Sequence, residues 1–119
     1  DGSATRDFIF TADLVNAIQK AAAAPSSNVS GEVFQIATSH ETTIGELAEL
    51  LCAALAKTGI SPPQVHFTEE RLGDIKRNYS DTSKAKRLLG WTASTSLAQG
   101  LRCVVNEFVP SDNTDATSA

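Results

Sequence analysis

Apolar residues recur at helical spacing in several stretches of the chain, and signals for helix ends flank each stretch. The first stretch predicts a helix over 12–23, with Thr11 as its N-cap and Asp13 in its first turn. The second begins at the sequence Thr-Ile-Gly-Glu of residues 43–46, which has the form of a capping box, and ends before Gly59. Both stretches have the length of ordinary helices in globular proteins.

Two further helices are predicted in the last third of the chain. A short one covers 83–89, with Asp81 or Thr82 as its N-cap and Gly90 as its stop. The other opens at a second capping-box sequence, Ser-Leu-Ala-Gln at residues 96–99, and carries an apolar stripe. The sequence therefore predicts four helices between residues 12 and 108.

Three short apolar runs, at 7–10, 31–37 and 64–68, are typical of β-strands. They alternate with the first two predicted helices, and this order is the pattern of right-handed parallel crossovers. We therefore predict an α/β fold, with a small sheet of short, mostly parallel strands and flanking helices.

The composition fits one small domain. The chain has 119 residues, of which 41% are hydrophobic. We predict a folded lobe over 1–109 and a disordered tail over 110–119, where no apolar residue is larger than alanine. No run suits a membrane span or a secretory signal, so we expect a cytoplasmic protein without a membrane partner. Because the chain lacks methionine and opens on Asp1, we also expect it to be part of a longer polypeptide.

A basic stretch interrupts this acidic chain. Residues 69–87 hold six of the ten Lys and Arg residues against four acidic ones, whereas the whole chain has a net charge of −4. Such a stretch indicates a local anion site. The net charge of −4 and the presence of only three aromatic residues beside the stretch, Phe67, Tyr79 and Trp91, disfavour nucleic acid as a partner. Arg71, followed by Gly73, can offer a guanidinium fork and a close backbone to phosphate oxygens. The alternative is that Arg71 pairs with a neighbouring carboxylate, from Glu69, Glu70 or Asp74.

No catalytic constellation is visible in the sequence. His40 and Glu41 begin a sequence like that of a zinc-binding helix, but Ile44 stands where the second histidine is needed, so we predict no metal site. Tyr79 and Lys84 are five positions apart across a helix start, a spacing that does not place the ammonium under the phenol. The chain has neither a glycine-rich dinucleotide loop nor a phosphate loop.

Four motifs in order resemble the C-terminal part of the extended short-chain dehydrogenases/reductases. They lie at 2–14, 31–38, 71–74 and 80–91, and they read GSATRDFIFTADL, GEVFQIAT, RLGD and SDTSKAKRLLGW. The likeness is greatest to the NAD-dependent nucleotide-sugar epimerases and dehydratases of the UDP-glucose 4-epimerase type. It covers nearly all of the chain before residue 110.

The resemblance implies a substrate-binding role. Arg6 and Arg71 would clamp the diphosphate of a UDP- or dTDP-sugar, and Phe8 would lie near the nucleotide. Asp74 would reach the ribose or hold Arg71, and Asn78 would occupy another substrate-side position. In a parallel sheet, Arg6 and Arg71 lie at opposite ends unless the loops bring them together. The resemblance assigns no catalytic, cofactor-binding or metal-binding residue to this chain.

The resemblance also implies that the chemistry resides elsewhere. In the family, an N-terminal Rossmann domain, absent from this chain, holds NAD and the catalytic groups. We therefore expect the parent protein to be an NAD-dependent nucleotide-sugar epimerase or dehydratase, with a homodimer of the parent as one option, and this fragment alone to be inactive. The alternative is a free-standing module that binds a nucleotide or another anion without catalysis.

Two departures from the family pattern bear on this reading. The second motif usually reads Asn-Ile-Gly-Thr-Gly, whereas Gln35, Ala37 and Ser39 replace the asparagine and both glycines here. Phe8 stands where some epimerases carry tyrosine, so a hydroxyl donor is missing. Neither departure identifies the sugar.

Overall fold

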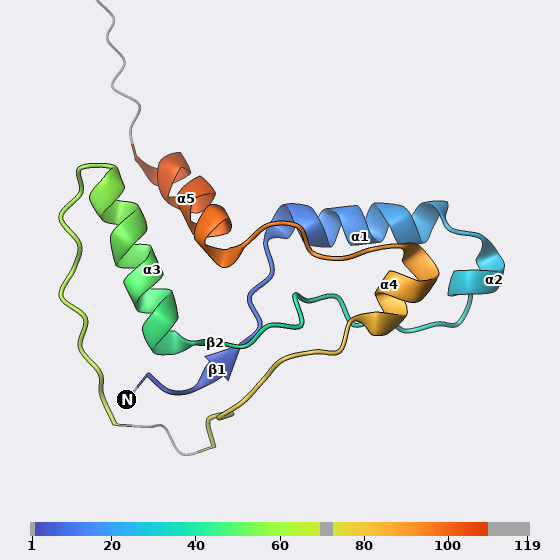
Figure 1. Ribbon diagram of the computed structural model, residues 1–119, viewed down its shortest axis with the longest axis horizontal. Helices are drawn as coiled ribbons and strands as arrows, with labels where there is room; N and C mark the ends of the chain where they lie inside the picture. The colour runs from blue at the N-terminus through green and yellow to red at the C-terminus, as the bar shows by residue number, and fades with distance from the viewer. Residues whose placement is uncertain (1, 70–72, 110–119) are drawn as a thin grey trace, which may run out of the picture.

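The computed structural model describes residues 2–69 and 73–109. The structure is a thin layer with extents of 62 × 50 × 19 Å, and Figure 1 views it down the shortest axis. Helices α3 and α5 pack together at one end of the layer, and α1 packs with α4 at the other. The predicted tail over 110–119 lies outside the described residues. The elements are β1 (Thr5–Arg6), α1 (Thr11–Ala23), α2 (Ser26–Val29), β2 (Thr42–Thr43), α3 (Ile44–Lys57), α4 (Ser83–Leu89) and α5 (Leu97–Phe108).

Both predicted capping boxes are confirmed. At the start of α3, the Glu46 N–H donates to the Thr43 hydroxyl over 3.0 Å, and the Thr43 N–H donates to the Glu46 carboxylate over 2.8 Å. Ser96 and Gln99 make the same reciprocal pair at the start of α5. Each box satisfies backbone donors that a helix start leaves unpaired.

The other helix ends agree with the sequence only in part. Thr11 is the first residue of α1 rather than its cap, and Phe10, at the cap position, makes no side-chain hydrogen bond there. Thr82 occupies the cap position of α4 without a side-chain cap, whereas the Asp81 carboxylate accepts the Ser83 N–H over 2.8 Å. Gly90 ends α4 at a φ of 59°, a left-handed conformation that glycine adopts without steric cost.

The predicted sheet is wrong in position and direction, although the α/β class is confirmed. Among the described residues, the sheet consists of β1 and β2, which pair antiparallel with Thr5 opposite Thr43 and Arg6 opposite Thr42. None of the three predicted strands forms at 7–10, 31–37 or 64–68. Further backbone contacts continue the pairing, because the Ile44 N–H donates to the Ala4 carbonyl over 2.9 Å.

Residues 31–37 do not form the predicted strand because no neighbouring strand pairs with them among the described residues. The side chains of residues 33–36 alternate as a strand's do, with Phe34 and Ile36 packed on the core and Val33 exposed. Within the described parts of the chain, however, no backbone group of residues 33–37 hydrogen-bonds to another backbone group. An apolar alternating segment becomes a strand only when a partner satisfies its backbone.

The core is small and centres on Trp91. Trp91 is 1% exposed, and it packs with Ala17 of α1 and Ala85 of α4. Its indole N–H donates to the backbone carbonyl of Asp13 over 3.1 Å. The partly buried residues around this cluster are Ile9, Phe34, Ile36, Leu89 and Ala93. The cluster therefore joins α1 and α4 to the segments on either side of them.

Much of the apolar face of α1 is exposed. The buried residues of this helix are Asp13 and Ala17, whereas Ile18 is 61% exposed, and Leu14 and Val15 are exposed as well. The apolar periodicity thus predicted the helix correctly but not which of its residues are buried. Among the described helices, none has both the length and the apolar character needed to cross a membrane.

Candidate functional site: an arginine between two chain segments

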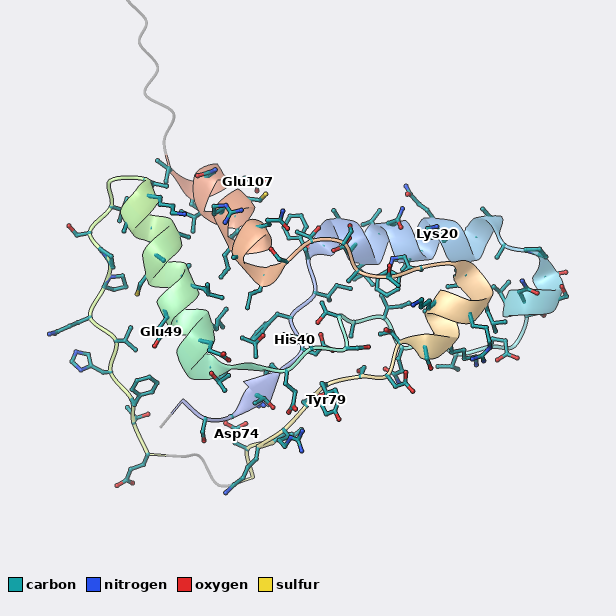
Figure 2. The ribbon with its side chains drawn as sticks, viewed as in Figure 1. Lys20, His40, Glu49, Asp74, Tyr79 and Glu107 are labelled. Atoms are coloured by element: carbon teal, nitrogen blue, oxygen red, sulfur yellow. The ribbon has the colours of Figure 1, made fainter. Side chains whose placement is uncertain are left out.

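The residues that follow Gly73 run alongside β1. The Thr5 N–H donates to the Lys76 carbonyl over 2.8 Å, and Nη1 of Arg6 donates to the Ile75 carbonyl over 2.6 Å. Figure 2 shows Asp74 and Tyr79 on this segment, which passes below β1. The chain therefore brings Arg6 next to the segment that begins with the Arg-Leu-Gly-Asp motif, as the sequence alone left open.

Arg6 is held in place by three acceptors. Nη1 donates to the carbonyl oxygens of Thr5 and Ile75, and Nη2 lies 3.1 Å from the Asp74 carboxylate. The side chain is 29% exposed. A guanidinium group has five N–H donors, so the Nε–H and one N–H of Nη2 remain without an acceptor among the described residues. These donors suit a phosphate oxygen.

Glu41, which directly precedes β2, hydrogen-bonds to both β1 and the segment 74–79. Its carboxylate accepts the Thr5 hydroxyl over 2.7 Å and a bidentate pair from Nε and Nη2 of Arg77, at 2.8 and 2.5 Å. The Arg77 guanidinium and the Thr5 hydroxyl lower the pKa of Glu41 from 4.5 to about 2. Arg77 also lies over the ring of Tyr79, 5.6 Å from its centroid.

Asp7 makes a second junction, beside the first. Its Oδ1 accepts both the backbone N–H and the hydroxyl of Thr38, the former over 2.8 Å, and its Oδ2 accepts the Ser80 N–H over 3.3 Å. Consecutive residues Arg6 and Asp7 thus hold the two ends of the segment 74–80. Sequence reasoning missed Asp7, Glu41 and Arg77 as site-forming residues, because no local pattern relates them to partners 31 to 73 positions away.

Phe8 lines a cleft of about 650 Å³. The cleft is bounded by α3 and by the residues that lead into α5. Apolar side chains of Leu50, Ala53 and Leu97 line it, together with polar ones that include His40, Glu46 and Glu49. Figure 2 shows Glu49 on α3 and His40 near the centre of the structure. Two carboxylates in the wall make this cleft less favourable for a diphosphate than the surroundings of Arg6.

The predicted site residues are therefore brought together only in part. Arg6 and Asp74 form an ion pair, and Phe8 faces a neighbouring cleft. Asn78 is exposed and its side chain makes no hydrogen bond within the described part of the chain. Arg71 lies outside the described residues. Asp74 pairs with Arg6, and its expected contact with the ribose or with Arg71 stays a prediction.

Tyr79 and Lys84 have separate partners. Lys84 pairs with Glu32 at 2.5 Å and lies over the ring of Phe34, whereas Tyr79 contacts Arg77. The two side chains are thus engaged on different segments, which agrees with their exclusion as a catalytic pair. In residues 2–69 and 73–109, no three His, Cys, Asp or Glu side chains gather in a group that could hold a metal ion.

Comparison with known families identifies the class to which this fold and site belong. The profile of the GDP-mannose 4,6 dehydratase family matches residues 1–104. The chain belongs to this family, within the extended short-chain dehydrogenases/reductases that act as nucleotide-sugar epimerases and dehydratases. The resemblance seen in the four sequence motifs is thereby confirmed.

The relatives of this chain include both epimerases and decarboxylases. The chain is 34% identical to UDP-glucose 4-epimerase of Mycolicibacterium smegmatis, over 91% of this chain and 32% of that protein. It is 35% identical to UDP-glucuronic acid decarboxylase 1 of Danio rerio, over 90% of this chain and 24% of that protein. The chain therefore spans a third or less of the length of these relatives.

Solved structures give the same picture. The UDP-glucose 4-epimerase of Thermotoga maritima, solved with UDP-glucose, superposes with a TM-score of 0.78 at 31% identity, covering 91% of this chain and 32% of that one. The Bordetella bronchiseptica enzyme WbmF, solved with NAD⁺ and UDP, superposes with a TM-score of 0.70 at 30% identity, covering 88% and 29%. The helices and the small sheet therefore match the C-terminal portion of such enzymes.

Proposed function

We propose that this chain is the substrate-binding portion of an NAD-dependent nucleotide-sugar epimerase or dehydratase, and that Arg6 binds the diphosphate of a UDP-sugar. The observation that carries the proposal is the guanidinium of Arg6, which three acceptors hold while its Nε–H and one N–H of Nη2 have no acceptor among the described residues. A pre-positioned fork loses little side-chain entropy when it binds a phosphate. The family membership and the UDP-containing relatives support the choice of ligand.

The remaining predicted residues have subordinate roles in this proposal. Asp74 holds Arg6 and can shift to a ribose hydroxyl when the diphosphate takes its place at the guanidinium. Phe8 offers an aromatic surface from the adjoining cleft, and Asn78, being exposed, can reach the ligand. Arg71 is the second arginine of the proposed clamp.

The described residues do not fit NAD itself. A dinucleotide site needs a glycine-rich turn between a strand and the start of a helix. Helix α1 follows Phe8, Ile9 and Phe10, and α3 follows the two threonines of β2. In the proposal, NAD and the groups that move hydride and protons belong to polypeptide outside this chain, and the chain alone shows no turnover.

Calorimetric titration of the chain with UDP tests the binding proposal. We expect saturation at one UDP per chain, and a loss of about 10- to 100-fold in affinity for Arg6→Gln, because a charge-assisted contact is removed. Arg102→Gln is the matched control, since Arg102 is exposed on α5 and its loss changes the net charge equally. Equal affinities in Arg6→Gln and wild type would contradict the proposal.

A salt series separates this function from the alternative of a general anion-binding module. Oligonucleotide binding through a charged surface weakens steeply with salt, whereas a single diphosphate contact weakens less. We expect UDP to compete effectively against a short oligonucleotide at 150 mM salt. Preference for the oligonucleotide would instead favour the module without catalysis.

A further inference from the structure

Glu41 is the residue at which three chain segments meet. Its carboxylate accepts the Thr5 hydroxyl of β1 and the bidentate Arg77 fork of the 74–79 segment, and it directly precedes β2. The Glu41 side chain is 24% exposed, whereas that of Arg77 is 68% exposed. One largely covered carboxylate therefore connects segments that are 36 and more positions apart.

These contacts form a closed ring of hydrogen bonds and backbone that includes Arg6. On one side, Glu41 is hydrogen-bonded to Thr5, which precedes Arg6 in the chain. On the other side, Glu41 is hydrogen-bonded to Arg77, which follows Ile75 and Lys76 in the chain. The two sides meet again, because the Thr5 N–H donates to the Lys76 carbonyl and Arg6 donates to the Ile75 carbonyl and to Asp74. Two of the three acceptors that fix Arg6, the Ile75 carbonyl and the Asp74 carboxylate, thus lie on a segment that Glu41 anchors.

We propose that Glu41 is a positioning residue for diphosphate binding, which acts through Thr5 and Arg77 to hold the guanidinium of Arg6 in its binding orientation. This inference rests on the proposed function of Arg6. It assigns to a carboxylate, which taken alone repels an anion, a net favourable effect on anion binding.

An ordinary surface ion pair does not explain the arrangement as well. An isolated exposed pair is loosely held and contributes little. Here the pairing with Arg77 is bidentate, and the same carboxylate also accepts a hydroxyl from the residue next to Arg6. Such geometry restricts orientation as well as distance.

The sign of the effect on UDP affinity distinguishes positioning from simple electrostatics. Removing a negative charge near an anion site should strengthen UDP binding by repulsion alone. If Glu41 positions Arg6, Glu41→Gln weakens UDP binding instead, by about 5- to 10-fold. The matched control is Glu107→Gln, which makes the same change of charge on the exposed surface of α5 and should alter affinity less than about twofold.

A double-mutant cycle shows whether Glu41 acts through Arg6. Lysine at position 6 keeps the charge but lacks the fork that the ring orients. In an Arg6→Lys background, we expect Glu41→Gln to change UDP affinity less than about twofold. An equal loss in both backgrounds, or no loss in the wild-type background, overturns the inference.

A measurement without ligand tests the positioning role of Glu41 separately from the proposed binding of UDP by Arg6. By NMR, Glu41→Gln should speed exchange of the Thr5 amide proton and increase the mobility of the Arg6 Nε–H, while Glu107→Gln changes neither. If the wild-type chain fails to bind UDP, the proposed function fails, and these two signals alone decide the positioning role. Unchanged signals overturn it. If Glu41→Gln does not fold, Arg77→Gln breaks the same ring from its exposed end, with Arg102→Gln as its control.

Discussion

Asp13 and Ser94 are 81 positions apart, yet Oδ1 of Asp13 accepts both the backbone N–H of Ser94, at 3.2 Å, and its hydroxyl, at 2.8 Å. Oδ2 of the same carboxylate accepts the Thr95 N–H over 2.9 Å. Asp13 is 5% exposed. Burial raises the pKa of Asp13, but the hydrogen bonds from Ser94 and Thr95 together outweigh burial and lower the pKa. A first-turn residue of α1 thus fixes the chain just before α5 begins.

Substitution of Asp13 should therefore destabilise the whole chain. We expect Asp13→Asn to lower the free energy of unfolding by about 1 to 3 kcal/mol, because buried donors lose a charged acceptor. Urea denaturation followed by circular dichroism measures the change. Asp81→Asn is a fair comparison, since Asp81 also accepts a local N–H but is exposed, and it should cost less than Asp13→Asn. Equal costs for the two variants would argue against the role of Asp13.

The capping box of α3 gives a second prediction. Thr43→Ala removes the side chain that accepts the Glu46 N–H, so we expect a loss of about 1 kcal/mol in the free energy of unfolding. Thr11→Ala should change this free energy by no more than about 0.5 kcal/mol, since Thr11 caps no helix in the structure. Urea denaturation of both variants checks the contrast. A larger loss for Thr11→Ala would instead support the N-cap role that the sequence predicted for Thr11.

The pH dependence of stability should report on Glu41. Its folded-state pKa is lowered from 4.5 to about 2, so its stabilising contribution is fully present above pH 4.5 and is lost as the pH falls toward 2. We expect the melting temperature of Glu41→Gln to lie below that of the wild type at pH 7 and the two to converge near pH 2. Melting curves at intervals of one pH unit measure this difference.

Glu107→Gln is the control for the pH series. Glu107 is exposed and accepts no hydrogen bond from a described residue, so its variant should follow the wild-type curve at every pH. A constant difference between Glu41→Gln and the wild type down to pH 2 would mean that the Glu41 carboxylate does not carry the effect.

The exposed apolar face of α1 predicts association or dye binding. Leu14, Val15 and Ile18 are all exposed on this one helix, so we expect the wild-type chain to self-associate or to enhance the fluorescence of anilinonaphthalene sulfonate. Ile18→Glu should lower the dye signal by about half, whereas Gln19→Glu, with the same charge change on the same helix, should not. A dilute wild-type monomer without dye signal would contradict the expectation.

The helices could be predicted from the sequence because their signals are local. Thr43 with Glu46, and Ser96 with Gln99, are three positions apart, and the structure shows the hydrogen bonds that these spacings predict. Strands depend on a distant partner, which explains why residues 31–37 carry a strand pattern without forming a strand. The strands that form among the described residues, β1 and β2, are two residues each and give no periodic signal.

The sequence predicted the kind of site, an anion site, but not which residues contact one another there. The basic stretch and the family motifs indicated Arg6 and Asp74, and the structure pairs them. Sequence alone did not indicate Glu41 or Asp7, because each acts through contacts that depend on how three segments are folded together. Long-range polar pairs of this kind leave no regular spacing in one sequence.

The backbone of residues 33–37, which pairs with no other backbone group in the described part of the chain, also makes this segment suitable for detecting a partner. Its amide protons should exchange with solvent almost as fast as those of an unfolded peptide, although Phe34 and Ile36 pack on the core. Any polypeptide that pairs with this segment would slow their exchange without altering the buried side chains. Deuterium uptake at these few amides would therefore time the assembly of the chain with a partner directly.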